Sequence, residues 1–390
     1  IAPLVLQFNC LYFYRVWQDE FRIADYFKSA VCFEPVFSTE QLSQIASILD
    51  RYFQEEQCID WQKIAVAMAL RQRFCLITGG PGTGKTTTVT KLLLTLQELY
   101  QNDLRIKLVA PTGKAAARLT ESIVDAVERL KLTFAQDPNQ REIIENLTIP
   151  MSAETIHRLL GVRFFSEETR YHADNPLPLD VLVVDEASMI DLTLMAKLLN
   201  ALKPDTKLIL LGDKDQLASV EAGAILGELG CFVNATKPTY SSSMAQYLQA
   251  TTGMTLPSEE KINAISDSIC YLQVSRRFGA NPEVGELATT VNLGNAAKSW
   301  QLLQQYQQHQ DKHCGVYLTD FAHYLSNKDD VQQRKACVKL IVDRAAQEYA
   351  RYLQQIPSEG ALHEDQVRSI FAAFNRIRFL TALRVGEFGV

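Results

Sequence analysis

The feature that most constrains this chain is a glycine-rich stretch, GGPGTGKT, at residues 79–86. It follows an apolar run at 74–78, typical of a buried strand, and precedes a helical pattern at 89–99. In a strand–loop–helix unit with this spacing, the backbone N–H groups of the loop surround phosphates, Lys85 reaches the outer phosphates and the Thr86 hydroxyl ligates magnesium. The helix N-terminus adds a partial positive charge. The pattern therefore predicts an ATP site formed by Gly79, Gly80, Pro81, Gly82, Thr83, Gly84, Lys85, Thr86 and Thr87.

Two more apolar runs end in polar side chains that suit the same chemistry. The run at 181–184 is continuous, as in a strand buried on both faces, and leads into Asp185 and Glu186. Beside a phosphate loop, Asp185 can hold the water shell of Mg²⁺ and Glu186 can polarise the water that attacks the terminal phosphate. The run at 207–211 leads to Gln216, whose amide is a candidate sensor of that phosphate.

A strand pattern at 106–110 is followed by a turn, Pro111 to Lys114, and a helix. This repeats the strand–turn–helix order of the first unit and predicts a parallel α/β sheet, with the turn at the carboxyl edge where ligands bind. Thr112 and Lys114 can hold a nucleic-acid phosphate there; a helix start with a solvated lysine fits equally well. Upstream of the loop, Gln62 can turn its amide toward an adenine edge or be an ordinary surface glutamine.

Composition sets wider limits. With 390 residues, 47% of them hydrophobic, the chain can form two or three domains, and no apolar run reaches the length of a membrane span. A net charge of −6 argues against a wholly basic surface but permits a local basic groove. Eight scattered cysteines without a Cys-x-x-Cys pair suit reduced thiols, so we expect a cytoplasmic protein without membrane contact.

The order of patterns predicts the following division of the chain. We expect the remnant of an N-terminal module with a connecting helix at 1–57, a first ATPase lobe at 58–230 with a hairpin near 162–173, a connecting segment at 231–270, and part of a second lobe with a helical insertion at 271–390.

Six segments together resemble the motifs of superfamily-one helicases, in the same order: GGPGTGKT, LVAPTGKAAARL, ETIHRLLG, VLVVDEASMIDL, LILLGDKDQLASVEAG and SRRFG. Within that superfamily the chain looks most like the helicase subunits of exodeoxyribonuclease V enzymes, which act in DNA recombination and repair. The resemblance extends from about residue 10 to the end of the chain.

This resemblance implies a P-loop fold of two RecA-like lobes that clamp ATP and Mg²⁺, and a five-prime to three-prime motor on single-stranded DNA. It implies duplex DNA as a substrate, and as partners a large helicase–nuclease subunit, which would do the cutting, and a Chi-recognising subunit. Gln62 matches the adenine contact, Gln216 the coupling glutamine, and Arg277, next to Arg276, the arginine of the second lobe that touches the terminal phosphate. The segments that line the single strand contain Pro111, Thr112, Lys114, Thr155 and His157, and residues 162–173 match the strand-splitting hairpin.

The sequence ends in TALRVGEFGV, at the approach to the fifth helicase motif, so we expect the second lobe to be incomplete in it. Two alternatives remain open at this point. One is a free-standing relative of these subunits or a conjugative helicase; the other is a nucleotide-gated DNA-binding subunit with little turnover.

Overall fold

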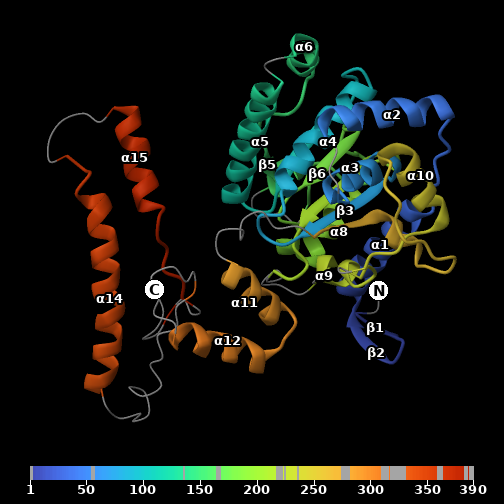
Figure 1. Cartoon of the computed structure of the whole chain (residues 1–390). Coiled ribbons are helices and arrows are strands. Elements are labelled where there is room, and N and C mark those ends of the chain that lie inside the picture. The colour runs from blue at the N-terminus through green and yellow to red at the C-terminus, as the bar shows by residue number, and fades with distance from the viewer. Residues whose placement is uncertain are drawn as a thin grey trace. The chain divides into compact units, whose positions relative to one another are not determined.

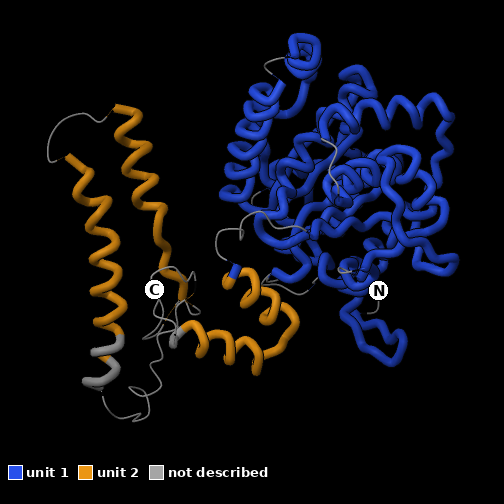
Figure 2. The backbone as a smooth tube through the Cα atoms, viewed as in Figure 1, with its two compact units in different colours: residues 1–282 blue, residues 283–390 orange. Residues whose placement is uncertain are grey.

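The computed structural model of the chain describes residues 3–53, 58–134, 137–163, 168–216, 223, 225–234, 237–273, 282–308, 316, 331–357, 363–381 and 385. The chain forms two compact units, residues 1–282 and 283–390 (Figure 2). Arg276 and Arg277, and residues 164–167 at the centre of the predicted hairpin, lie outside the described residues.

The first unit is built on a sheet with the order β5-β4-β6-β7-β3-β8, in which every pairing is parallel (Figure 1). Its strands are β3 (Phe74–Gly79), β4 (Ile106–Ala110), β5 (Glu154–Thr155), β6 (Val181–Val184), β7 (Lys207–Gly212) and β8 (Ile269–Leu272). The predicted parallel α/β fold is confirmed. The strand that precedes the phosphate loop lies inside the sheet, between β7 and β8.

Helices cover both faces of this sheet, which explains the continuous apolar runs. Along β3, Cys75 and Ile77 belong to one core cluster, whereas Phe74 and Leu76 belong to the other, because successive side chains in a strand point to opposite faces. The first cluster includes residues of α2 (Thr39–Tyr52), α3 (Trp61–Arg71), α4 (Lys85–Leu99), α5 (Gly113–Thr133) and α10 (Ser242–Thr252). The second includes residues of α1 (Tyr14–Val31), α7 (Ile156–Leu160), α8 (Leu192–Asn200) and α9 (Ile225–Gly230).

The N-terminal segment is part of the first unit and not a separate module. The ring of Phe27 in α1 lies 4.6 Å, centroid to centroid, from the ring of Phe74 in β3, and Ile45 and Leu49 of α2 are fully buried in the first core cluster. Before α1, β1 (Leu4–Gln7) and β2 (Cys10–Phe13) form an antiparallel hairpin. The apolar faces of α1 and α2 thus pack against the two faces of the sheet.

The first unit also extends past the boundary expected near residue 230. The segment expected as a connection contains α10, which buries Met244, Tyr247 and Leu248. Residues 269–272, where the expected connection gives way to the expected second lobe, form β8, which pairs with β3 so that Leu272 lies opposite Gly79. A strand pattern in the sequence does not show which sheet the strand joins. Here the strand forms its backbone hydrogen bonds with β3 and so belongs to the sheet of the first unit.

The second unit consists of helices in its described part: α11 (Pro282–Asn292), α12 (Ala296–Gln308), α14 (Val331–Leu353) and α15 (Glu364–Phe374). Tyr352 of α14 packs edge-on against Phe374 of α15, with 5.0 Å between ring centroids. Residues 379–381 form neither a helix nor a strand. None of the helices described in either unit has the length and apolar character needed to cross a membrane.

Candidate functional site

At two glycines of the loop, any larger residue would be strained or would displace its neighbours. A Cβ atom on Gly79 would lie 2.9 Å from Thr83 Oγ1 and 3.0 Å from the backbone oxygen of Leu272. Gly84, the N-cap of α4, has φ of 84°, and a Cβ there would collide with the side-chain amide of Gln62. The loop is therefore a tight turn packed between β8 and the start of α3.

Lys85, the first residue of α4, folds back over this loop. Its Nζ donates to the backbone oxygen of Gly79 at 2.6 Å and to that of Gly80 at 3.2 Å. The hydroxyl of Thr83 also donates to the Gly80 oxygen, at 2.9 Å. The ammonium group thus lies against the backbone of the loop, and Lys85 lines the cavity described below.

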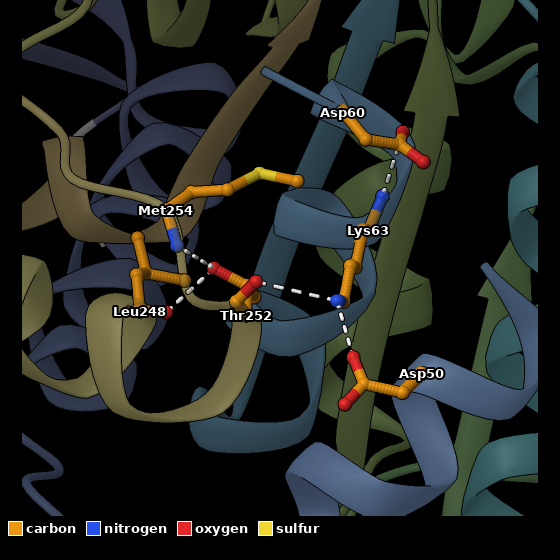
Figure 3. Close-up of polar contacts among 6 residues, drawn as sticks. All are labelled: Asp50, Asp60, Lys63, Leu248, Thr252 and Met254. Atoms are coloured by element: carbon orange, nitrogen blue, oxygen red, sulfur yellow. Dashed lines mark hydrogen bonds and ion pairs between the residues drawn. The ribbon is translucent and has the colours of Figure 1, made fainter. Parts of the chain in front are cut away.

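The start of α3 places Gln62 against the same loop. Asp60 caps the helix by accepting from the backbone N–H groups of Gln62 and Lys63, at 2.9 and 3.2 Å. The Nε2 group of Gln62 then donates to the Thr83 backbone oxygen at 3.0 Å. Figure 3 shows how the buried Lys63 secures this end of the helix: its Nζ donates to Asp50 of α2 at 2.6 Å and to the backbone oxygen of Thr252 at 3.2 Å.

A cavity of about 740 Å³ brings together four of the five predicted catalytic residues, all except Arg277, which lies outside the described residues. Asp185, Glu186 and Gln216 line it, as do Pro81, Gly82, Thr83, Gly84, Lys85, Thr86 and Thr87. Gly79, Gly80 and Gln62 do not line the cavity; the two glycines begin the loop, and Gln62 contacts it. The size is in the range of small-molecule sites.

Asp185 sits at the end of β6 in an environment that disfavours its charge. Its backbone N–H donates to the Val109 oxygen at 2.9 Å, which continues the pairing of β6 with β4. Burial raises the pKa of its carboxyl to about 6, and the nearby Glu186 charge adds to this, while the hydrogen bond from the Glu186 backbone and the charge of Lys85 oppose it. Glu186 itself has a left-handed backbone, with φ of 51°, which is uncommon for a non-glycine residue and concentrates at functional sites.

The loop that carries Gln216 is tied to the strands on either side of the phosphate loop. The Lys214 backbone N–H donates to Thr78 Oγ1 of β3 at 3.2 Å, and the hydroxyl of Tyr271 in β8 donates to Asp215 at 3.3 Å. Burial raises the pKa of Tyr271 to about 12, and the charges of Asp215 and Asp213 contribute to this rise. This phenol is therefore a neutral donor, and Gln216 follows directly in the chain.

The predicted DNA-contacting residues meet at one edge of the sheet. In the pairing of β4 with β5, Ala110 lies opposite Thr155, so the turn beginning with Pro111 and the start of α7 are neighbours. Lys114 and His157 are exposed there. The hydroxyls of Thr112 and Thr155 cap α5 and α7, accepting from Ala115 and Arg158 at 3.2 Å each. The caps fix both helix starts at this edge.

The segment predicted as a hairpin begins and ends at the same place, next to the last residues of α7. The backbone N–H groups of Arg170 and Tyr171 donate to the oxygens of Gly161 and Leu160, at 3.4 and 3.2 Å. The ends of the excursion are therefore side by side beyond α7. Whether 162–173 form paired strands stays a prediction, because its centre lies outside the described residues.

The sequence interpretation missed one wall of the cavity. It is a face of α5 that contributes Arg118, Ser122, Asp125 and Arg129. Their spacing, i, i+4, i+7 and i+11, is a helical stripe that can be read from the sequence. The pattern alone, however, does not distinguish a stripe that faces a ligand from one that faces solvent.

Residues 62–222 match a family model described as an AAA domain. Over 404 aligned residues the chain is 47% identical to the RecBCD enzyme subunit RecD of Haemophilus influenzae, and the alignment covers 100% of this chain and 59% of that protein. It is 39% identical over 151 residues to the ATP-dependent RecD2 DNA helicase of Deinococcus radiodurans, with 39% of this chain and 17% of that protein covered.

Among solved structures, the Pif1 helicase from Candida albicans matches with a TM-score of 0.34 and 16% identity, and the match covers 84% of this chain and 62% of that one. The chain spans about three fifths of the length of the two RecD proteins that it matches from end to end.

Proposed function

Since this chain belongs to the family of RecD subunits of RecBCD enzymes, we propose that the full protein is an ATP-dependent five-prime to three-prime DNA helicase. It acts as a motor subunit of an exodeoxyribonuclease V complex in the cytoplasm and serves recombination and repair of double-strand breaks. Its partners are a large helicase–nuclease subunit, which does the cutting, and a Chi-recognising subunit. The observation that carries this proposal is the shared cavity of Lys85, Asp185, Glu186 and Gln216.

The roles follow from where each group lies. Lys85 binds the outer phosphates of ATP, and Glu186 orients and activates the attacking water. Thr86 and Asp185 offer hydroxyl and carboxylate oxygens in the same cavity, the hard donors that Mg²⁺ takes, so these residues fit that ion. Bound there, Mg²⁺ neutralises charge on the phosphates. Gln62, which supports the loop, reads the adenine with its remaining amide groups.

DNA binding belongs to the neighbouring edge. Lys114 and His157 contact the phosphates of a single strand that runs past the starts of α5 and α7, while Pro111, Thr112 and Thr155 shape that path. Gln216, which lines the nucleotide cavity on a loop held by β3 and β8, couples hydrolysis to movement on DNA. An arginine at 276 or 277, a few residues after β8 in the chain, is the remaining group that we assign to the terminal phosphate.

The test is the ATPase rate of the full-length protein with and without single-stranded DNA. We expect weak hydrolysis that DNA increases strongly, and loss of this activity in Lys85→Gln. Lys131→Gln, a change near the end of α5 that does not line the cavity, is the matched control and should behave as wild type. Normal stimulated hydrolysis by Lys85→Gln would contradict the assignment of the loop.

A second candidate is a free-standing helicase, which the partial identity to a RecD2 protein supports. Purification of the full-length protein from its own cells separates the two. Co-purification with two larger subunits supports the complex, and a lone protein that unwinds DNA supports the free-standing helicase. Little ATP turnover in either form, despite tight DNA binding, would point to a nucleotide-gated binding subunit.

A further inference from the structure

Helix α5 turns a charged face toward the nucleotide cavity. Arg118, Ser122, Asp125 and Arg129 line the cavity, and the other side of the helix buries Leu119, Ile123 and Val127 in the core. Core packing on one side thus fixes which side chains the helix presents on the other. This polar face does more than contact bulk solvent, because it lines the same cavity as Lys85 of α4.

The two arginines on this face have their binding groups available. Among the described residues, neither Arg118 nor Arg129 forms an ion pair or a side-chain hydrogen bond, and Asp125 on the same face pairs with neither. Elsewhere the chain pairs such groups: Arg105 binds Asp180 with two nitrogens, at 2.9 and 2.8 Å. A guanidinium with its fork of donors unused, in a cavity built around a phosphate loop, suits a phosphate group.

The positive charges that line the cavity also indicate a phosphate ligand. Beyond Lys85, the only cations on its described wall are Arg118 and Arg129, and they come from a helix that the phosphate-loop pattern does not include. They are eleven residues apart on α5, which is about 16 Å along the axis. At this separation the two guanidinium groups would meet different parts of a bound nucleotide.

We propose that Arg118 and Arg129 form a second anion-binding wall, which binds the phosphate chain of the nucleotide from α5 and holds the phosphate released by hydrolysis. This inference rests on the proposed nucleotide site. An arginine supplied in cis can stabilise the charge of a transferring phosphoryl group, as one supplied in trans does. Helix α5 would then bring two arginines to the phosphates, independently of residues 276 and 277.

The test is equilibrium binding of ATPγS, ADP and inorganic phosphate to the full-length protein by calorimetry. The variants are Arg118→Gln, Arg129→Gln and the double change, with Lys131→Gln as the control on the same helix and Lys85→Ala as the reference for the site. We expect the double variant to bind ATPγS about tenfold more weakly than wild type does. Its affinity for inorganic phosphate should fall by a larger factor. Its binding should also depend less on salt, because two exposed cations are removed.

The single variants identify which arginine dominates, and Arg→Lys at that position should restore only part of the affinity, since lysine lacks the planar fork. Wild-type affinities in the double variant, with weak binding by Lys85→Ala, would overturn this inference and leave the nucleotide site intact. If Lys85→Ala also bound normally, the proposed nucleotide site itself would be wrong. Equal weakening by Lys131→Gln would show a general charge effect and would overturn the inference as well. A folded state is verified for every variant by circular dichroism.

Discussion

The side-chain amide of Gln62 donates a hydrogen bond of 3.0 Å to the backbone oxygen of Thr83. This contact joins the start of α3 to the phosphate loop, so a residue proposed to read the base also supports the residues proposed to bind the phosphates. Lys63, the next residue, anchors the same end of the helix to α2 and α10.

Gln62→Ala should therefore weaken nucleotide binding in two ways. Loss of the Thr83 contact should lower affinity for every nucleotide, and loss of the adenine contact should lower it further for ATP. We expect about a tenfold loss for ATP and a smaller one for GTP, as measured by calorimetry. An equal loss for both nucleotides would mean that Gln62 only supports the loop.

Lys114→Ala tests the DNA edge. If Lys114 neutralises one phosphate of a single strand, the slope of log affinity against log salt should become shallower by about 0.7. The measurement is a salt titration of single-stranded DNA binding, with Lys131→Ala as the control. Should slope and affinity both remain unchanged, Lys114 would be a solvated helix-start lysine.

Asp185→Asn should raise the stability of the protein while it abolishes ATP hydrolysis. The pKa of Asp185 is about 6 in the folded chain and about 3.9 in the unfolded chain. Between these values the unfolded chain has already released the proton that the folded chain still holds. The folded state therefore loses stability as the pH rises through this interval. Above pH 6 the amide removes this penalty, and the variant should be more stable by about 2–3 kcal/mol in metal-free buffer. Below pH 4 the gain should vanish.

Denaturant unfolding at pH 3.5 and pH 8 measures this difference. The amide introduced by Asp185→Asn keeps a side-chain oxygen for the Glu186 backbone N–H, which in wild type donates to Asp185 at 2.9 Å. The variant should nevertheless lose ATP hydrolysis, because the carboxylate proposed for Mg²⁺ is gone. Equal or lower stability of the variant at pH 8 would contradict the burial argument.

Tyr271→Phe tests how the Gln216 loop is positioned. The change removes only the hydroxyl that donates to Asp215, so basal hydrolysis and the KM for ATP should persist while the DNA-stimulated kcat falls roughly fivefold. Tyr247→Phe is the matched control, since its hydroxyl donates to the Ala67 oxygen inside the core. It should lower stability and leave stimulation unchanged. Equal stimulation of wild type and Tyr271→Phe would remove Tyr271 from this role.

Local patterns sufficed wherever a short, continuous stretch determines the structure. The strand at 74–79, the turn and the start of α4 at Lys85 follow from an apolar run, glycines that tolerate positive φ and a helical repeat, all close together in the sequence. The same holds for β6 before Asp185 and for the fold class, because continuous apolar strands that alternate with helices require a parallel sheet covered on both faces.

Tertiary structure decided which of these pieces meet. The sequence put the boundary between the connecting segment and the second lobe at residue 271, whereas packing places Ile269–Leu272 at the edge of β3 and thereby sets Tyr271 beside Asp215. A period of 3.6 gives α5 a polar face, but only the burial of Leu119, Ile123 and Val127 places Arg118 and Arg129 on the wall of the cavity that the phosphate loop also lines. Likewise, the pKa of Asp185 depends on its burial and on the charge of Lys85, which lies far from it in the sequence. The periodicity of a sequence shows which face of a helix or strand is buried, whereas only the tertiary structure determines which element packs against that face.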